Sequence, residues 1–434
     1  MFKVKCFSVL VCLSVTVLVA QTPHGWRGPA RNGTYSETGL LKSWPTDGPE
    51  LLWEATDAGN GYSSPVIVNN RIYLTGMNEA EDKETFIAYT MDGKKIYEVE
   101  YGNPWAYSYP ETRTTPAIEN GKAYMISGSA EIVCVNIADG SIVWKVDGGT
   151  QFERKPGTWG TSECPLVFDN KVIYTPSGDQ TTMVALNAQT GEVVWKSKPL
   201  GDVGCYVSPI LISYKGKRQI VGSTAMKLIG VNPDNGAIEW TFGGWGVQNP
   251  TLYPEGHQYR AQTQGSTSWV NIAPNTALYK DGHIFFCHGY NIGGFKLQLN
   301  DDLTDVSLLW KTADLSTHHG GYVLVNGVLY GSNHIDNSAG NWVAVDWETG
   351  KTKYNESWQA RSKGSIVTAD GMLYCYEERR GTIALVKPNP EKFDIVSEFR
   401  RKSNGKGPYW AHPVINNGVL YIRHGNALMA YKIK

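Results

Sequence analysis

The chain has 434 residues, with 40 Lys and Arg against 41 Asp and Glu, and this balanced charge argues against nucleic acid as a partner. Glycine is abundant at 47 residues, aromatic residues make up 12% and charged residues only 19%, a composition typical of many short strands joined by tight turns. No long stretch shows the periodicity of an amphipathic helix. We therefore expect an all-β architecture.

Residues 1–20 have the pattern of a secretory signal peptide. Lys3 and Lys5 precede the apolar run from Phe7 to Val19, and the small residue Ala20 follows at the expected cleavage point. The run is too short to cross a membrane comfortably. We expect these residues to be removed, the mature chain to contain no transmembrane segment, and the protein to be periplasmic or secreted. Residues 21–49 then form an N-terminal extension.

From residue 50 onward the chain repeats one hairpin pattern, in which a turn such as Asn-Gly, Asp-Gly or Asp-Asn separates two apolar runs. Asn, Asp and Gly accept the positive φ of a two-residue hairpin turn. In the fourth unit, PILISYKGKRQIVGS, we expect a longer turn. The eight units begin at Pro65, Pro116, Pro165, Pro209, Ala277, Tyr322, Ile366 and Pro413.

In most units a second pair of strands follows, separated by a polar Gly turn and ending near a tryptophan, as in IADGSIVWK and NAQTGEVVWK. Each unit thus supplies four strands. A lone four-stranded sheet cannot bury both faces, whereas sheets stacked radially around an axis can. The last unit ends after its third strand, and the segment from Glu50 to Ala55, with Trp53, offers the missing fourth. We predict an eight-bladed β-propeller over residues 50–434, with four-stranded antiparallel blades, closed by this N-terminal strand.

The tryptophan repeats resemble the docking motif of the quinoprotein alcohol dehydrogenase-like, or PQQ-like, propellers. Residues 26–33, with the sequence WRGPARNG, are similar to the opening of many secreted members. The resemblance implies that Trp144, Trp195, Trp240 and Trp310 pack between blades rather than hold a ligand. Because the shared motif is structural, it implies the fold and leaves the activity open.

Propeller topology predicts where a ligand binds. The D–A and B–C loops share one face, and the innermost strand A lines the central channel, so the loops that lead into strand A form a funnel. We call the position three residues before each unit its mouth position. The mouth positions are charged and aromatic as well as small: Tyr62, Arg113, Ser162, Tyr206, Pro274, His319, Lys363 and Trp410.

Six of the nine histidines fall in the loops of this face, in units five, six and eight. Converging histidines bind metal ions or exchange protons near neutral pH. The alternative is that each histidine only satisfies the backbone of its own loop. We assign His318, His334, His412 and His424 to a divalent metal such as Ca²⁺ or Mn²⁺, His319 and His288 as bases, and Tyr62 and Tyr206 as acids. The candidate ligand-binding residues are Arg113, Trp159, Glu163, Lys363, Arg379, Trp410 and Arg423.

Three functions remain open. The first is a carbohydrate-directed protein without a quinone, in which the funnel binds a saccharide or acts on it as a lyase. In that case the long connection from Gly243 to Asn275, rich in aromatic residues, forms one wall of the cleft. The second is a PQQ-dependent dehydrogenase. The resemblance implies for it a pair of adjacent cysteines against the quinone, and no Cys-Cys or CxxCH sequence occurs here, so PQQ is in doubt.

The third function is a protein-binding scaffold like the propeller subunit of the outer-membrane assembly machinery. For all three we expect a monomer with a small-molecule or saccharide ligand, or a protein partner, at the funnel. The five cysteines after residue 20 are widely spaced and form no CxxC, so we expect buried free thiols.

Overall fold

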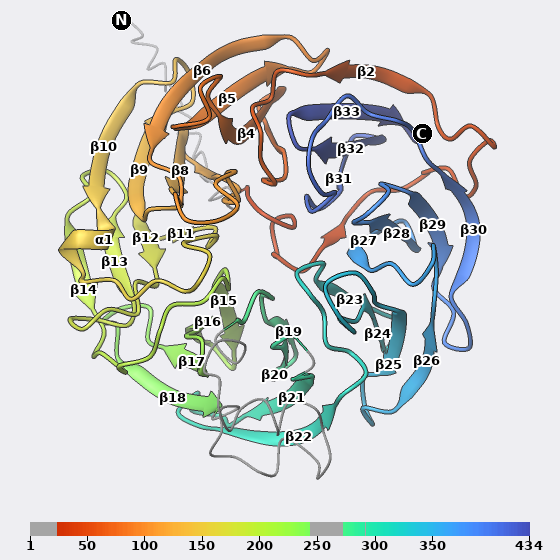
Figure 1. The fold of residues 1–434 in the computed structure, drawn as a ribbon. Helices are drawn as coiled ribbons and strands as arrows, with labels where there is room; N and C mark the ends of the chain where they lie inside the picture. The colour runs from red at the N-terminus through yellow and green to blue at the C-terminus, as the bar shows by residue number, and fades with distance from the viewer. Residues whose placement is uncertain (1–23, 244–271, 291) are drawn as a thin grey trace, which may run out of the picture.

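The structure is a computed structural model that describes residues 24–243, 272–290 and 292–434. The predicted signal peptide and most of the long connection from Gly243 to Asn275 lie outside these residues. Eight four-stranded antiparallel units surround a central axis, as predicted (Figure 1). In each unit the first strand lies innermost. No helix in the described ranges is long and apolar enough to cross a membrane.

The strands of the first four blades follow one another in sequence order from the axis outward. They are β3 (Val66–Val68), β4 (Arg71–Met77), β5 (Glu84–Thr90) and β6 (Lys95–Gly102); β7 (Ala117–Glu119), β8 (Lys122–Ile126), β9 (Glu131–Asn136) and β10 (Ile142–Asp147); β11 (Leu166–Phe168), β12 (Lys171–Tyr174), β13 (Val184–Asn187) and β14 (Val193–Lys196); β15 (Ile210–Tyr214), β16 (Lys217–Ser223), β17 (Lys227–Val231) and β18 (Ile238–Gly243). One short helix, α1 (Gly148–Gln151), follows β10.

The other four blades follow the same order, and the last one takes its outer strand from the N-terminal region. They are β19 (Leu278–Lys280), β20 (His283–Cys287), β21 (Gly294–Leu299) and β22 (Val306–Thr312); β23 (Tyr322–Val325), β24 (Val328–Ser332), β25 (Trp342–Asp346) and β26 (Thr352–Glu356); β27 (Gly364–Ala369), β28 (Met372–Glu377), β29 (Ile383–Lys387) and β30 (Asp394–Phe399); β31 (Val414–Asn416), β32 (Val419–His424), β33 (Ala427–Lys432) and β2 (Leu51–Ala55).

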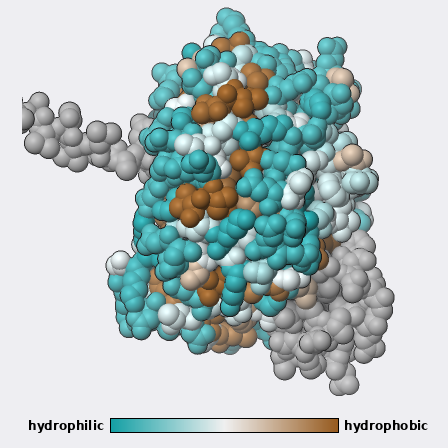
Figure 2. Space-filling model, turned by 90° about the vertical axis from the view of Figure 1, so that its left-hand side faces the viewer, coloured by the Kyte–Doolittle hydropathy of each residue, from teal (hydrophilic) through white to brown (hydrophobic). Residues whose placement is uncertain are grey.

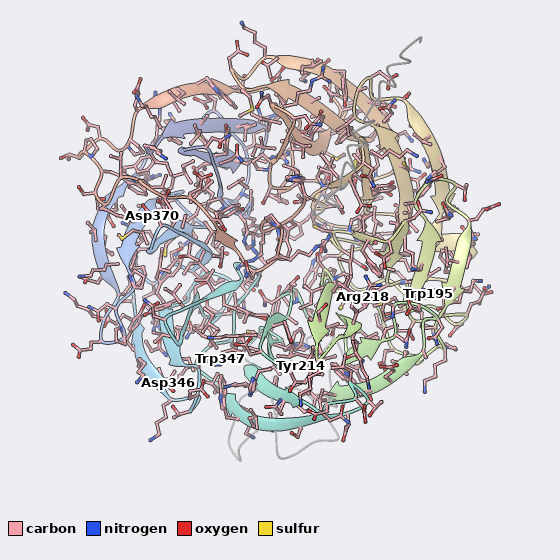
Figure 3. All side chains as sticks on the ribbon, turned by 180° about the vertical axis from the view of Figure 1, so that it is seen from behind. Trp195, Tyr214, Arg218, Asp346, Trp347 and Asp370 are labelled. Atoms are coloured by element: carbon pink, nitrogen blue, oxygen red, sulfur yellow. The ribbon has the colours of Figure 1, made fainter. Side chains whose placement is uncertain are left out.

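The inner hairpin of every blade closes with a two-residue turn in which both residues have positive φ, the geometry that Asn-Gly and Asp-Gly favour. The expectation of a longer turn in the fourth unit was wrong. There Lys215 and Gly216 form the same tight turn, and the strands on either side are longer instead. Figure 3 labels Tyr214, the last strand residue before this turn, and Asp370, which lies in the corresponding turn of the seventh blade.

The tryptophans near the ends of the outer strands dock onto the next blade. The Trp144 indole donates to the Ala188 carbonyl at 3.0 Å and Trp195 to Pro233 at 3.1 Å. Gly191 and Gly236, in the outer turns of the blades that receive them, lie against these rings so closely that a Cβ there would come within 2.9 Å of them. Glycine at these turns therefore makes room for the indole of the preceding blade.

The ring closes as predicted. Strand β2 pairs antiparallel with β33, with Trp53 opposite Ala430 and Ala55 opposite Leu428. The Trp53 indole then donates to the Met91 carbonyl of the first blade at 2.9 Å, so the closing blade docks as the others do. The two ends of the chain thus complete one blade.

The N-terminal extension occupies the axis of the ring, which the sequence did not predict. Arg27 donates to the carbonyls of Tyr322 at 2.6 Å and Ile366 at 3.2 Å. On the opposite side Arg31 donates to the carbonyls of Cys164 and Pro209, both at 3.0 Å. Strand β1 (Thr34–Tyr35) then pairs in parallel with β27. We call residues 24–35 the axial segment; it crosses the centre of the ring in Figure 1.

The outer rim of the ring is largely hydrophilic, with small separate hydrophobic patches (Figure 2). Exposed apolar residues on the outer strands, such as Val143 on β10 and Val194 on β14, contribute to this surface. The five described cysteines are free, and four of them are buried, in agreement with the sequence analysis.

Candidate functional site

A cavity of about 310 Å³ opens at the mouth of the channel, with Trp26 of the axial segment in its wall. Its size is that of a small-ligand pocket. Seven of the eight mouth positions line it, and the exception is Lys363. The lining residues are Trp26, Tyr62, Tyr109, Arg113, Trp159, Ser162, Cys164, Tyr206, Ser208, Ile272, Pro274, Tyr290, His318, His319, Asn337, Trp410 and His412.

Aromatic rings form two groups in the cavity wall. In the first, the Trp410 ring lies 4.9 Å from that of Tyr62 and 5.6 Å from that of Tyr109. In the second, the Trp159 ring stacks on Tyr290 at 6.5 Å and lies 6.0 Å from Tyr206. Burial raises the pKa of the Tyr206 hydroxyl to about 12, so it is neutral at physiological pH.

Arg113 is the only Lys or Arg among the described residues that line the cavity. Its guanidinium is already occupied by backbone, because it donates to the carbonyls of Trp159 and Tyr109 and to that of Ser108 at 3.1 Å. These bonds hold together the loops that carry two of the wall aromatics. Arg113 therefore shapes the wall, and three of its five N–H donors are engaged there.

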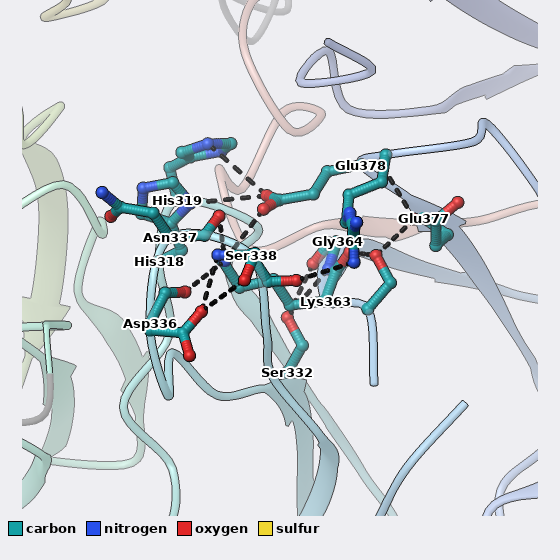
Figure 4. Close-up of polar contacts among 12 residues, drawn as sticks. His318, His319, Ser332, Asp336, Asn337, Ser338, Lys363, Gly364, Glu377 and Glu378 are labelled. Carbon is teal, nitrogen blue, oxygen red and sulfur yellow. Dashed lines mark hydrogen bonds and ion pairs between the residues drawn. The ribbon is translucent and has the colours of Figure 1, made fainter. Parts of the chain in front are cut away.

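A cluster of two histidines and a carboxylate lies beside the first aromatic group (Figure 4). His318 Nδ1 lies 3.4 Å and His319 Nε2 lies 3.8 Å from the same oxygen of Glu378. The His319 ring also lies 5.0 Å from that of Trp410. Burial lowers the pKa of both histidines well below the usual value. The cluster thus presents neutral imidazoles to the cavity.

The second oxygen of Glu378 pairs with Lys363, whose ammonium lies 3.0 Å away and also donates to the carbonyl of Asp336 at 2.8 Å (Figure 4). Only 1% of the Lys363 side chain and 6% of the Glu378 side chain is exposed. Lys363, predicted to bind ligand, therefore lies behind the cavity wall, where its charge balances Glu378.

The other histidines assigned to the metal divide into two groups. The His334 ring packs 4.9 Å from that of His318, and its Nδ1 has no hydrogen-bond partner in the described parts of the chain. His412 has both nitrogens engaged, one with Arg27 at 2.9 Å and one with the His319 carbonyl at 3.0 Å. His424 likewise contacts the Ser403 hydroxyl and the Gly407 carbonyl. The structure therefore brings His318 and His334 together and leaves His412 and His424 occupied elsewhere.

Four further predicted site residues do not line the cavity. His288 is fully buried and lies near the carbonyl of Ala225. Glu163 accepts from the Thr175 amide at 3.1 Å, and burial raises the pKa of its carboxyl to about 8. The two arginines donate to backbone carbonyls. Arg379 donates to the carbonyl of Ser338. The buried Arg423 donates to the carbonyls of Gly59, Ser63, Thr75 and Gly425.

Glu378, Tyr109 and Trp26 are among the residues of the site that sequence reasoning missed. Glu378 lies in the B–C loop that follows β28. Tyr109 belongs to the long loop before the second unit, where no register fixes its position. Trp26 reaches the cavity only because the axial segment fills the channel. The WRGPARNG motif was the one signal that this segment had a defined place.

An eight-bladed ring with tryptophan docking between its blades and a cavity on its axis defines the class of PQQ-like repeat propellers. The chain belongs to this family. The family model described as outer membrane protein assembly factor BamB matches residues 92–356.

The relatives include quinoprotein alcohol dehydrogenases and BamB proteins. The chain is 24% identical over 247 residues to quinoprotein alcohol dehydrogenase PedH of Pseudomonas putida, covering 53% of this chain and 35% of PedH. It spans about a third of the length of the first curated relatives that it matches. Among solved structures, BamB from Moraxella catarrhalis has a TM-score of 0.61 at 14% identity, covering 88% of this chain and 99% of BamB. Quinohemoprotein alcohol dehydrogenase from Comamonas testosteroni has a TM-score of 0.66 at 13% identity, covering 93% of this chain and 79% of the enzyme.

The residues around the cavity do not fit PQQ, which is a planar quinone with several carboxylates. An anion with several carboxylates needs several free cationic donors, and three of the five N–H donors of Arg113 are engaged by backbone carbonyls. Lys363 is paired with Glu378 behind the wall. Cys164 lines the cavity without an adjacent cysteine in the sequence. The cavity therefore suits a ligand with little negative charge.

Proposed function

We propose that the protein binds a neutral, hydroxylated ring compound of the saccharide type in the cavity at the channel mouth. The observation that carries this proposal is the combination of two aromatic groups with uncharged polar side chains in one wall. The flat faces of Trp410 and Trp159 suit the C–H face of a sugar ring. The hydroxyls of Ser162 and Ser208 and the Asn337 amide offer hydrogen bonds to its hydroxyl groups.

The charges around the cavity favour a neutral saccharide over a uronate. Elimination from a uronate needs a cation that neutralises the sugar carboxylate. Arg113 donates to backbone carbonyls, and Lys363 and Arg379 lie outside the cavity lining. A buried carboxylate without such a partner is costly. We therefore propose binding of a neutral sugar as the function of this cavity, rather than lyase chemistry.

Titration of tryptophan fluorescence with a panel of neutral and acidic saccharides tests the proposal. We expect neutral sugars to bind, and Trp410→Ala to weaken binding about tenfold because a stacking face is lost. Tyr107→Ala is the matched control, since Tyr107 is 83% exposed and does not line the cavity. The proposal fails if no saccharide binds at millimolar concentration, or if the two variants lose affinity equally.

A second candidate function is a protein-binding scaffold, which the family match over residues 92–356 favours. Co-purification with outer-membrane protein precursors tests it, and Trp410→Ala should leave such an association unchanged. Both candidates place the protein outside the cytoplasm, and we propose that residues 1–20 direct its export.

A further inference from the structure

We propose that His318, His319 and Glu378 form a binding site for one divalent transition-metal ion of the zinc type. One ligand atom from each residue lies within 4.8 Å of the other two. The two histidines line the cavity, so the ion would face the space in which a ligand binds. The site goes beyond the saccharide proposal, because it stands on its own residues and can be tested without a sugar.

The distances leave room for a metal ion. Ligand atoms around a tetrahedral zinc ion lie roughly 3.3–3.5 Å apart, given bonds of about 2.0–2.2 Å. The shared oxygen of Glu378 lies 3.4 Å from His318 Nδ1 and 3.8 Å from His319 Nε2. These two gaps close with shifts of a few tenths of an ångström. The two histidine nitrogens lie within 4.8 Å of each other, and rotation of their side chains in the cavity wall would bring them to the spacing that a shared ion needs.

Two ring nitrogens, one in the cluster and one beside it, are buried without a hydrogen-bond partner among the described residues. They are Nε2 of His319 and Nδ1 of His334. His334 is only 3% exposed, and its ring packs against that of His318. Buried polar atoms are nearly always satisfied, so each unsatisfied one requires an explanation. A metal ion bound to Nε2 of His319 would supply the partner that this nitrogen lacks. The unsatisfied Nδ1 of His334 lies on a ring that packs against His318, next to the same site.

Hydrogen bonds already orient two of the three ligands. His318 Nε2 lies 3.0 Å from the Tyr290 hydroxyl, which leaves its Nδ1 directed at Glu378. Lys363 holds the far oxygen of Glu378, so the near oxygen faces the histidines (Figure 4). Outer partners of this kind fix ligand orientation in known metal sites. The nearby ammonium also lowers the affinity for a cation, so we expect moderate rather than very tight binding.

The ligand types select the metal. Imidazole suits zinc, cobalt, nickel and copper, whereas Ca²⁺ takes six to eight oxygen ligands. A set of three protein ligands leaves a coordination position open toward the cavity. This choice replaces the calcium or manganese ion expected from the sequence, and it replaces His412 and His424, whose nitrogens are hydrogen bonded elsewhere.

Cobalt titration of the tag-free, EDTA-treated chain tests the site, because bound Co²⁺ gives visible absorption bands. We expect one Co²⁺ per chain, displaced by Zn²⁺ and not by Ca²⁺. His318→Ala and His319→Ala should each weaken binding at least about 100-fold, beyond the 10–100-fold loss typical of an outer partner. His283→Ala is the matched control, because His283 lies in the turn-side part of β20, away from the cavity lining.

Circular dichroism shows whether each variant folds, and His319→Gln replaces His319→Ala if the alanine variant does not. The inference is overturned if the wild-type chain binds no Co²⁺, or if folded variants at positions 318 and 319 bind it as well as His283→Ala does. Metal binding without sugar binding refutes only the saccharide proposal. Sugar binding by a chain that takes up no metal refutes only the metal site.

Discussion

Replacing Lys363 with Met removes the ammonium that pairs with the buried Glu378 carboxylate. The pair is 3.0 Å apart, and the Lys363 and Glu378 side chains are 1% and 6% exposed. Lys363 also donates to the carbonyls of Asp336 and Asn337, at 2.8 and 3.2 Å. Removing one partner of a buried ion pair costs about 3–5 kcal/mol, because the other charge stays buried and unpaired. We expect Lys363→Met to lose that much free energy of unfolding.

The double variant Lys363→Met/Glu378→Gln separates the ion pair from the lost carbonyl contacts. It buries no unpaired charge, so we expect it to recover about 1–3 kcal/mol of the loss. Urea unfolding at pH 7 in EDTA measures all three free energies. Lys387→Met, at an exposed lysine, is the control and should change stability by less than about 0.5 kcal/mol.

A loss below about 1 kcal/mol in Lys363→Met, or a double variant that is less stable than the single one, would refute this reasoning. The metal proposal adds a further expectation. In the Lys363→Met variant a bound Zn²⁺ ion takes over the role of the missing charge. Zinc should therefore stabilise this variant more than it stabilises the wild-type chain.

Two further predictions concern pH and blade docking. The carboxyl of Glu163 has its pKa raised to about 8 by burial, against about 4.3 when unfolded, so between these values the folded chain holds a proton that the unfolded chain has lost. The stabilising contribution of the Glu163 carboxyl is complete below the unfolded pKa and is lost as pH rises toward 8. Glu163→Gln should therefore reduce the fall of the unfolding free energy with pH by up to about 1.4 kcal/mol per pH unit. If urea unfolding from pH 5 to 8 gives the same pH dependence of this free energy for both proteins, the prediction is wrong. Gly236→Ala should destabilise by about 2–4 kcal/mol, because its Cβ would lie 2.4 Å from the Trp195 ring at a φ of +76°. Gly216→Ala, at a φ of +78° with no atom within 4 Å, should lose only about 1–2 kcal/mol, and equal losses in the two variants would argue against docking.

The ring could be predicted because its determinants are local and repeated. Turns such as Asn326-Gly327 and Asp370-Gly371 specify the hairpin by their own conformational preferences, and each recurs at the same place in its blade. The complementarity of Trp53 and the incomplete last unit then specified closure. The place of the axial segment could not be predicted in this way, because the bonds of Arg27 and Arg31 reach backbone carbonyls that no sequence pattern marks.

The cavity was predicted in outline for a similar reason. Counting back from strand A gives a fixed register, and seven of the eight positions found in this way line the cavity. The direction of a long side chain is not set by register. Lys363 and Arg423 turn toward carbonyls and a carboxylate inside the wall, because a buried cation must be satisfied there. The position of a residue relative to strand A therefore predicted whether it lines the cavity better than its charge did.

The axial segment also has a kinetic consequence. Arg27 bonds to His412, 385 residues later, and β2 pairs with β33, so both of these N-terminal elements find their partners only after the rest of the chain is in place. Such distant pairings make folding slow, since the entropy of a long closed loop is lost before contacts repay it. Until the ring closes, the partly formed array of blades has an exposed strand with unpaired backbone groups, and such an edge promotes aggregation. A chain that lacks its final strand, β33, could not pair it with β2, so its ring would stay open even if the other blades form.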